Sequence, residues 1–502
     1  MKSPLVRILA FALILSACTP APPPPVTTEV AATAATAPTG DGADLSIFKD
    51  GLRPTSREAL SSLVGASIYR IDYTIDESLT SLQGQERVHY TNREEIALSE
   101  IDVRLLPNVL NGAMQVLNVT VDDTIVDETY DLQDSLLRIP LDTLLAPGES
   151  LDLGFEFSVY VPTELESNYG ILAYYDGVLT LAHGYPMIAV YDDEGWNAEI
   201  PPDQGDPTYA DASFFLVRVD APANLVLVAS GYEVSREEHG DRQLVAFAAG
   251  PARDFYLAAS PDYVVVSKNL DGVTFNSYAS GQEKEAARVA LDDAVAAFEV
   301  FEQRYAPYPY TEFDIIATPT YALGVEYPGV IAITNRLYDL SGSLSGMPNR
   351  NLMESVVVHE AGHQWFYNLV GNDQLDEPWL DESLVQFATW QYYLDRYGAS
   401  GASGFEASLR ARWARVDDQP IPIGLPVAEY TGSAYSAIVY GRGAFFFEAL
   451  RERLGEEHFD AFMQDYTQTN AWGIATGESL KALAEEYCDC DLSDLYEEWV
   501  LP

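Results

Sequence analysis

Positively charged side chains are scarce in this chain of 502 residues. Lysine and arginine together number 28, of which five are lysine, whereas aspartate and glutamate number 77, and the formal net charge is −49. A surface of this charge repels the phosphates of nucleic acids and of anionic lipids. The composition therefore argues against a nucleic-acid partner and suits a protein that works outside the cytoplasm.

Cysteine is also rare, with three residues in the whole chain. Cys488 and Cys490 are separated by one aspartate, and a disulfide between them would close a small, strained ring. Metal binding is the alternative, although no further cysteine and no histidine lies nearby to complete a ligand set. The sequence leaves this choice open.

Apolar runs long enough to span a bilayer are absent as well. The short run Ile8–Leu15 follows Lys2 and Arg7, and the residues after it complete the lipobox Leu-Ser-Ala-Cys at Cys18. This pattern predicts that residues 1–18 are a lipoprotein signal peptide, removed before Cys18, whose thiol then carries a lipid. We therefore expect an extracytoplasmic protein that is anchored to a bacterial membrane as a lipoprotein. An ordinary secretory signal with an incidental cysteine is the alternative.

The rest of the chain divides into a spacer and two larger regions. Residues 19–45 are mainly proline, alanine and threonine, cannot form a core, and are predicted to be a semi-rigid linker. Residues 46–267 alternate apolar and polar side chains in short runs between turn residues, which predicts a large antiparallel β domain. Residues 268–502 show helical periodicity from Gln282 onward. The expected fold class is multidomain α+β.

The second region is predicted to be mainly helical around a few strands. An edge strand within residues 323–333 could hold an extended peptide by backbone pairing. One helix should end at Tyr397–Gly398, residues 399–428 are expected to be irregular, and another helix should begin at Ala434. Three short helices are expected at about residues 456–470, 477–487 and 491–499.

Two loops of the β region, 184–196 and 205–211, are rich in aromatic and turn residues. Loops of this kind often line a cleft, but they could equally pack a domain interface. His183 stands beside the first loop and could reach a site, although an ordinary structural role is the more usual one for a single histidine.

The most informative stretch is Asn351–Ser383, which contains His359-Glu360-Ala-Gly-His363 and then Glu382. Four residues along a helix turn about 400°, so the two histidines lie on one face and can share a zinc ion. Glu382 follows His363 by 19 residues, near the expected start of a second helix, and supplies a third ligand. Three protein ligands leave an open position, which is typical of catalytic zinc. A core helix with two hydrogen-bonded histidines is the competing interpretation.

Two motifs here resemble those of the aminopeptidase N family of gluzincins. The run His359–Asn368 is similar to the family's HExxHxWxGN, with Tyr367 where glycine is usual. The run Trp379–Ser383 is similar to the family's WLNEG, with Asp381 in place of asparagine. The likeness extends over about residues 60–500.

Two further segments fit the same family. Leu323–Tyr327 occupies the place of its GxMEN exopeptidase motif and keeps the glutamate, Glu326, in register. Leu323 stands where the motif begins with glycine, and Tyr327 stands where it has asparagine. Tyr435–Gly443 resembles the segment that carries the family's catalytic tyrosine, which falls on Tyr440. The loop Gly205-Asp-Pro resembles one found where the family's β domain resumes its strands.

The resemblance implies a saddle-like β domain followed by a thermolysin-like, mainly α catalytic domain. It implies one zinc ion, and peptide substrates that are bound by Glu326, Gly324 and Tyr435. We also expect the chain to end without the family's large C-terminal helical domain. The β region shows no clear counterpart of the second residue that holds the substrate amine in the family.

The chemistry of these residues gives each a role. Zinc on its three ligands would polarise the scissile carbonyl and lower the pKa of a water. Glu360 would act as general base and then protonate the leaving amine, Tyr440 would donate a hydrogen bond to the oxyanion, and Glu326 would anchor the free α-amine. These roles predict a lipid-anchored zinc aminopeptidase. The altered exopeptidase motif favours a zinc endopeptidase or other hydrolase as the alternative, and a non-catalytic surface binding lipoprotein is the third candidate.

Overall fold

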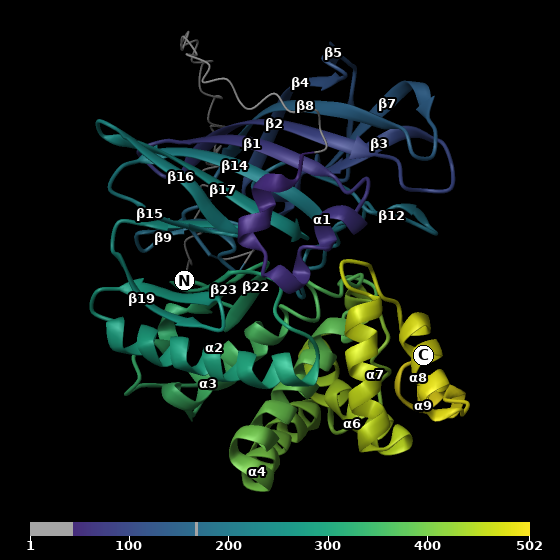
Figure 1. Ribbon diagram of the computed structural model, residues 1–502. Coiled ribbons are helices and arrows are strands. Elements are labelled where there is room, and N and C mark those ends of the chain that lie inside the picture. Colours follow the sequence, from purple (N-terminus) through teal and green to yellow (C-terminus); the bar gives the residue numbers. More distant parts are fainter. Residues whose placement is uncertain (1–43, 166–168) are drawn as a thin grey trace, which may run out of the picture. The chain divides into compact units, whose positions relative to one another are not determined.

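The computed structural model describes residues 44–165 and 169–502. The predicted signal peptide, Cys18 and nearly all of the predicted linker lie outside the described residues. Within the described part, sheets form one region, and helices packed on a smaller sheet form the other (Figure 1). This arrangement confirms the predicted α+β fold class. No described helix is both long and apolar enough to cross a bilayer.

The first region is built around a large sheet, for which eight strands are described. Their order is β16 (Tyr232–His239), β17 (Arg242–Ala252), β14 (Ser213–Pro222), β1 (Ile68–Ile75), β2 (Ser81–Thr91), β8 (Ser150–Tyr160), β4 (Ala113–Val121) and β5 (Thr124–Ile125). All neighbours in this sheet run antiparallel, as predicted, except β1 and β14, which run parallel. In β8, Leu153, Phe155 and Phe157 are buried and alternate with more accessible side chains, which is the pattern that the sequence shows.

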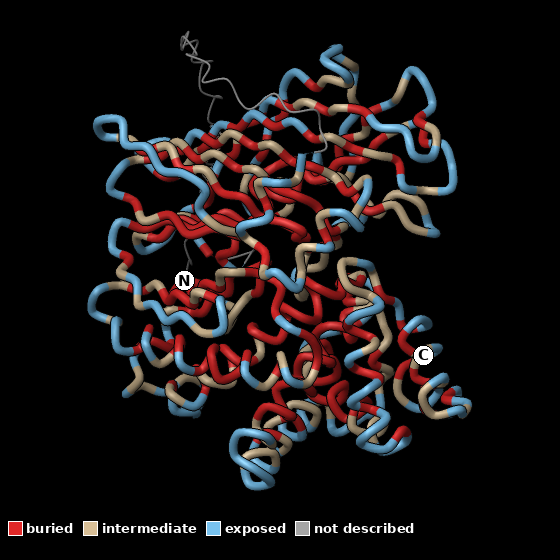
Figure 2. The backbone as a smooth tube through the Cα atoms, in the orientation of Figure 1, coloured by how far each residue is buried: buried red, intermediate tan, exposed pale blue. Residues whose placement is uncertain are grey.

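Two smaller sheets of the first region pack on the same apolar core. One has the order β15 (Val226–Ala229), β18 (Leu257–Ser260), β10 (Val178–Leu181) and β9 (Leu172–Tyr175), and the other has β11 (Met187–Ile188), β3 (Leu98–Arg104), β7 (Leu136–Leu145) and β6 (Thr129–Asp131). Val217, Leu179 and Ile101, one from each sheet, belong to a single buried cluster. Figure 2 shows the buried stretches of backbone, in red, that run through the middle of this region. Burial of this shared core is what holds the three sheets together.

A mixed sheet begins the second region. Its order is β19 (Tyr263–Leu270), β20 (Val273–Ser280), β21 (Glu312–Thr318), β23 (Val330–Thr334) and β22 (Gly324–Tyr327). β22 lies at the edge, as predicted, and Pro328 and Gly329 form the turn that joins it to β23. Because β19 pairs with β20, the change of sheet precedes residue 263, a few residues before the predicted boundary at 267. Alternation within one strand cannot tell which sheet that strand joins.

Helices cover this sheet and pack on one another. The principal ones are α2 (Lys284–Arg304), α3 (Asn349–Gly362), α4 (Leu384–Trp413), α6 (Gly443–Leu454), α7 (Glu456–Thr469), α8 (Gly477–Cys488) and α9 (Ser493–Trp499). The last three confirm the three short helices expected from the sequence. α2 buries Ala290, Ala294, Phe298 and Phe301, and the small alanines let α3 approach closely.

The prediction of an irregular segment at 399–428 is wrong for its first half. Helical structure resumes after Gly398, whose backbone (φ 67°, ψ −164°) breaks the helix, and it continues to Trp413. Residues 399–413 contain two glycines and alternate polar with small side chains, so they lack the continuous apolar stripe that indicates a helix. Phe405 and Leu409 nevertheless pack into the core and stabilise this extension.

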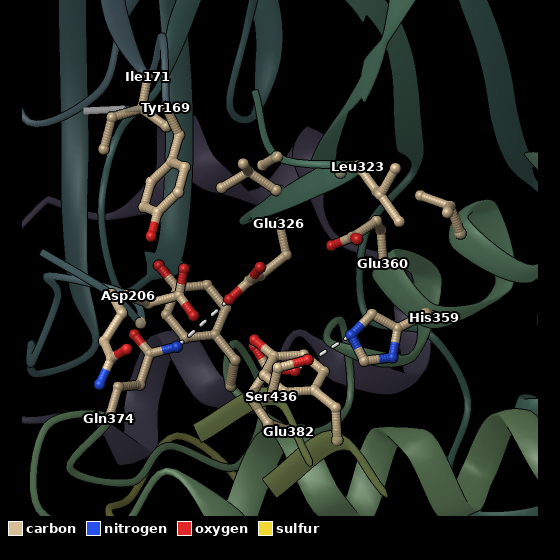
Figure 3. A pocket seen from close by; sticks show the side chains of 18 of the residues that line it. Tyr169, Ile171, Asp206, Leu323, Glu326, His359, Glu360, Gln374, Glu382 and Ser436 are labelled. Carbon is tan, nitrogen blue, oxygen red and sulfur yellow. Dashed lines mark hydrogen bonds and ion pairs between the residues drawn. The ribbon is translucent and has the colours of Figure 1, made fainter. Parts of the chain in front are cut away.

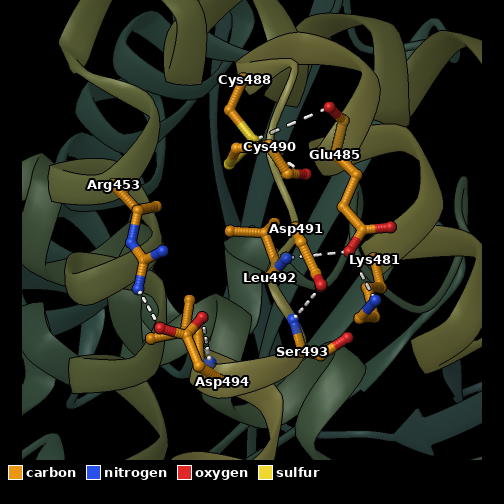
Figure 4. The surroundings of a disulfide bond; sticks show 10 residues. Arg453, Lys481, Glu485, Cys488, Cys490, Asp491, Leu492, Ser493 and Asp494 are labelled. Carbon is orange, nitrogen blue, oxygen red and sulfur yellow. Dashed lines mark hydrogen bonds and ion pairs between the residues drawn. A yellow bond between two sulfur atoms is a disulfide. The ribbon is translucent and has the colours of Figure 1, made fainter.

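Cys488 and Cys490 form a disulfide at the end of α8 (Figure 4). The bond joins the last residue of the helix to the start of the connection to α9. The side chain of Glu485 also spans this connection, because it accepts hydrogen bonds from the Leu492 backbone N–H and the Lys481 ammonium. The structure therefore favours the disulfide over the alternative of metal binding by these cysteines.

Arg253, at the end of β17, ties the β region to the helical region. Its buried guanidinium donates hydrogen bonds to the carbonyl oxygens of Tyr367, Asn368, Ala210 and Gly473. Burial lowers the pKa of Arg253 to about 10, which still leaves the side chain charged at neutral pH. Residues 367–368 come four and five positions after His363, at the end of the run His359–Asn368, so this contact fixes the end of that run.

Replacing Arg253 by methionine should destabilise the fold. The substitution keeps an apolar stem of similar length but leaves several buried carbonyls without donors, at a cost of about 1–3 kcal/mol each. We expect the free energy of unfolding in urea to fall by roughly 3–5 kcal/mol. The matched control is Arg288→Met, because Arg288 is an exposed residue of α2 with only an i,i+3 ion pair, and it should change by less than about 0.5 kcal/mol. Equal effects of the two substitutions would contradict the role of Arg253.

Candidate metal centre and active site

The three predicted ligands converge at one point. His359 projects from the last turn of α3, His363 follows the helix end at Gly362, and Glu382 lies in the π-turn Trp379–Ser383 that precedes α4. The Nε2 atoms of His359 and His363 are 3.4 Å apart, and they lie 3.1 and 3.6 Å from Oε2 of Glu382. The sequence spacing predicted this convergence, although the helix, which the apolar residues on both sides of the motif predict to continue through Phe366, ends at Gly362.

These three atoms have the spacing that a tetrahedral metal ion requires. Ligands at about 2.1 Å from a zinc ion lie about 3.4 Å from one another in tetrahedral geometry. The Nδ1–H of His363 donates to the carbonyl oxygen of Phe366 at 3.0 Å, which leaves the lone pair of Nε2 directed at the other ligands. Burial lowers the pKa of His359, so that imidazole is available in the neutral form that binds metal. The residues therefore fit zinc.

Two π-turns position the ligands and the tyrosine. The first holds Glu382, and the second, Ile438–Arg442, holds Tyr440. The hydroxyl of Ser383 donates to the carbonyl oxygen of Val439 at 2.7 Å, so the two turns are bonded directly to each other. The Tyr440 hydroxyl donates to Oε1 of Glu382 at 2.6 Å. Such turns are rare in proteins and often occur at functional sites.

Carboxyl groups crowd the metal ligands. Glu326, Glu360 and His363 each offer an atom within 4.8 Å of the others, and so do Asp206, Glu326 and Glu382. Burial, and then the charge of Asp206, raise the pKa of Glu326 well above its usual range, and burial with the charge of Glu326 does the same for Glu360. Several like charges so close together can ionise only when cations join them. A divalent metal and an ammonium group are cations of the right kind.

Side-chain amides hold these carboxylates in place. Gln364 donates to the carbonyl oxygen of Tyr327 and accepts from the Gly329 N–H, which fixes the hairpin that carries Glu326 against the end of α3. Gln374 donates to Asp381 at 2.8 Å and to Glu326 at 3.3 Å. Gln374 thus connects Glu326, the predicted amine anchor, with Asp381, the neighbour of the metal ligand Glu382.

A cavity of about 410 Å³ is lined by most of the groups described above, namely Asp206, Glu326, His359, Glu360, Gln374, Glu382 and Tyr440. In Figure 3, Glu326 lies between Asp206 on one side and Glu360 on the other, and all three carboxyl groups face the same space. Tyr169 and Ile171 of the β region line the side that lies beyond Asp206. The loop at 205–208 also lines this cavity, so it belongs to the cleft, as one of the two sequence interpretations proposed.

Comparisons with known proteins agree with this geometry. The pattern of the peptidase family M1 domain matches residues 289–499. These residues are an M1 peptidase domain. This result confirms the resemblance to the aminopeptidase N family of zinc gluzincins, and it covers both π-turns and all three metal ligands.

Individual relatives extend the likeness beyond the M1 domain. Aminopeptidase M1 of Arabidopsis thaliana is 25% identical over 80% of this chain and 47% of its own length. Aminopeptidase M1-B of Oryza sativa subsp. japonica is 28% identical over 57% of this chain and 34% of its own length. The chain therefore spans less than half the length of these two relatives.

A solved structure shares both regions of the fold. The M1 zinc metallopeptidase of Deinococcus radiodurans superimposes with a TM-score of 0.64 and 20% identity, over 87% of this chain and 95% of that one. A variant of that protein was also solved with a Tyr-Ser-Ala substrate, and it superimposes with a TM-score of 0.62. At this identity, the likeness concerns the fold alone.

The structure brings the predicted substrate residues to the M1 cavity. Gly324 lies against Glu360, and a Cβ placed at Gly324 would come within 2.4 Å of Oε1 of that glutamate, so a side chain there would displace it. Tyr435 lines the cavity, and its ring centroid lies 5.6 Å from that of Tyr440. His183 also lines the cavity, with Nε2 2.9 Å from the Thr208 hydroxyl.

Two departures from the usual M1 motifs have structural explanations. Tyr327 stacks on Tyr256 with ring centroids 3.8 Å apart, so it belongs to the packing between the two regions. Tyr367 occupies the usual glycine position with a φ of 126°, a conformation that is strained for any other residue. The buried contacts of its backbone with Arg253 and of its phenol with Asp254 compensate for this strain.

Asp206 and Gln374 are site residues that the sequence analysis did not identify. Asp206 comes from the β region, about 120 residues before Glu326, and Gln374 comes from the segment between the two metal-binding elements. The signal for Asp206 was present in the Gly205-Asp-Pro loop, which was noted only as a structural likeness. Nothing in the local sequence pattern distinguishes Gln374.

The metal site predicts a defined stoichiometry. We expect the protein to bind one zinc ion per chain, and His363→Ala and Glu382→Ala to weaken binding more than about a hundredfold, since each removes a direct ligand. The measurement is equilibrium dialysis followed by elemental analysis. His458→Ala is the matched control, because His458 is exposed on α7 and should keep wild-type zinc content. Zinc retained by either ligand variant would contradict the assignment.

Proposed function

We propose that this protein is a zinc-dependent aminopeptidase that releases N-terminal residues from peptides. One observation carries the proposal: the carboxyl pair Asp206 and Glu326 lies in the same cavity as the metal ligands, within 4.8 Å of Glu382. Glu326 is buried and Asp206 partly buried, and a pair of acids so placed beside a cation site attracts an ammonium group. The names of the relatives and the peptide bound to the Deinococcus structure support a peptide substrate.

Each residue of the cavity has a task in this reaction. Zinc, when bound by His359, His363 and Glu382, supplies a Lewis acid and acidifies a water. Glu360 accepts the proton of the attacking water and delivers it to the leaving amine. Burial raises the pKa of Tyr440 well above its usual range, so its phenol stays protonated and can donate a hydrogen bond to the developing oxyanion.

The acid pair determines the register of cleavage. Gln374 holds Glu326, and Asp206 approaches it from the β region, so a free α-amine can be bound from both sides. An acetylated amino end carries no charge and leaves both carboxylates unpaired, which is costly in a buried site. Asp206 thereby supplies the second amine-binding group that the sequence motifs did not reveal.

One assay separates the candidate activities. A peptide with a free amino end and its N-acetylated form are compared, each with and without a chelator. Cleavage of the free form alone, abolished by chelator, supports the aminopeptidase. Cleavage of the acetylated form supports the endopeptidase, and no cleavage of either supports a binding protein.

Glu360→Gln should lower kcat by about 10²–10⁴-fold, because an amide cannot accept the proton. Its zinc content should equal that of the wild type, since Glu360 is not a ligand. The control is Glu354→Gln, six residues earlier on α3, because Glu354 does not line the cavity and its partners are Arg350, Tyr392 and Tyr397. Wild-type turnover by Glu360→Gln would refute the role of this glutamate.

We further propose that the protein acts outside the cytoplasm, anchored to a bacterial membrane by a lipid on Cys18. The lipobox and the apolar run before it support this location. Cys18→Ser should abolish metabolic labelling with a radioactive fatty acid and release the protein from the membrane fraction. Cys488→Ser is the matched control and should keep the label. Labelling that persists in Cys18→Ser would exclude the anchor.

A further inference from the structure

One basic side chain stands out among the many acids of the cavity. Of the lining residues that the structure describes, Arg412 is the only arginine or lysine, whereas five carry carboxyl groups. Arg412 belongs to the part of α4 that follows Gly398, which the sequence analysis expected to be irregular. Its position in the cavity is therefore a result of the tertiary structure.

Arg412 has no described partner of opposite charge. Among the described residues, no carboxylate lies within ion-pair distance of Arg412, and no hydrogen bond of its guanidinium is observed. The guanidinium carbon instead lies 5.8 Å from the ring centroid of Tyr440. Burial lowers the pKa of Arg412, and the more distant charge of Glu382 offsets this effect only in part. An arginine in such a place is suited to bind an incoming carboxylate.

The charges are ordered across the cavity. Asp206 and Glu326 lie on one side, next to Glu382 and His363. Arg412 lies next to Tyr440 and acts electrostatically on His359, at the other side of the ligand set. A peptide with its amino group at the acid pair and its first carbonyl at the metal centre would extend toward Arg412. The guanidinium carbon lies 5.8 Å from the Tyr440 ring centroid, and the Tyr440 hydroxyl lies 2.6 Å from Oε1 of Glu382. The guanidinium is therefore at most about 11 Å from that ligand, and because each extended residue advances at most about 3.6 Å, no more than about three residues fit between them.

We propose that Arg412 binds the C-terminal carboxylate of short substrates, so that the preferred substrates are dipeptides and tripeptides with both ends free. This inference rests on the proposed aminopeptidase function and specifies its substrate class. A competing role for Arg412 is to position Tyr440 through the contact with its ring. The two roles differ in one property: only the first depends on the charge at the far end of the substrate.

The test compares Leu-Ala with Leu-Ala amide, which differ only in that terminal charge. For the wild type, we expect kcat/KM to be roughly 10- to 100-fold higher for Leu-Ala than for the amide, mainly because KM is lower. A hydrogen bond between charged groups contributes a difference in binding of about this size. Arg412→Gln should bring this ratio to about one, and Arg412→Lys should retain part of it. Arg415→Gln is the matched control, because Arg415 is exposed three residues further on and does not line the cavity.

Two results would overturn the inference. One is a wild-type ratio near one, and the other is an equal loss of activity toward both substrates in Arg412→Gln, which would show that Arg412 only positions Tyr440. Either result is compatible with the proposed aminopeptidase activity, because the hydrolysis of Leu-Ala amide is measured in the same experiment.

If the wild type cleaves neither substrate, the proposed function fails, and calorimetry decides on Arg412 separately. The zinc-loaded Glu360→Gln protein should bind Leu-Ala more tightly than the amide, and adding Arg412→Gln should remove the difference. Equal binding of the two ligands before that change would overturn the inference.

Discussion

The crowding of buried carboxyl groups around one point is the constraint on which the rest of this structure depends. Asp206, Glu326, Glu360, Asp381 and Glu382 lie within a few side-chain lengths of one another, and burial raises the pKa of four of them. Glu382 is the exception, because the two histidines favour its ionised form over the effect of burial. Such a group of acids is stable as anions only with cations present. A metal ion and a substrate amine together meet that requirement.

The surrounding elements keep these acids from moving apart. The two π-turns are bonded to each other through Ser383, and Gln364 and Gln374 fix the hairpin that carries Glu326. Arg253 holds the segment after His363 by its carbonyl oxygens. Trp365 is buried among aromatic rings at the same helix end, and its indole N–H donates to the carbonyl oxygen of Ala306. The site is rigid because each of its parts is bonded to an element from another part of the chain.

Both regions contribute to the cavity, which bears on how a substrate is recognised. The M1 domain supplies the metal ligands, Glu360, Glu326 and Tyr440, and the β region supplies Asp206 and the side of the cavity at Tyr169. The metal centre and the general base therefore belong to the M1 domain alone, whereas the binding of the amino end requires both regions. The proposed preference for free amino ends depends on the contact between the two regions as much as on the M1 domain.

The sequence by itself determined the chemistry of the centre. His359, Glu360, His363 and Glu382 are recognisable because four-residue helical spacing places the two histidines on one face. Glu326 and Tyr440 are recognisable from the residues beside them, which resemble family motifs. Alternation of side chains identified the β region in the same way. Asp206, Gln374, Arg253 and Arg412 were decided only by the tertiary structure. Each of them acts on residues about 50 to more than 100 positions away, or lies in a segment without regular periodicity, and local patterns carry no information about such distant contacts.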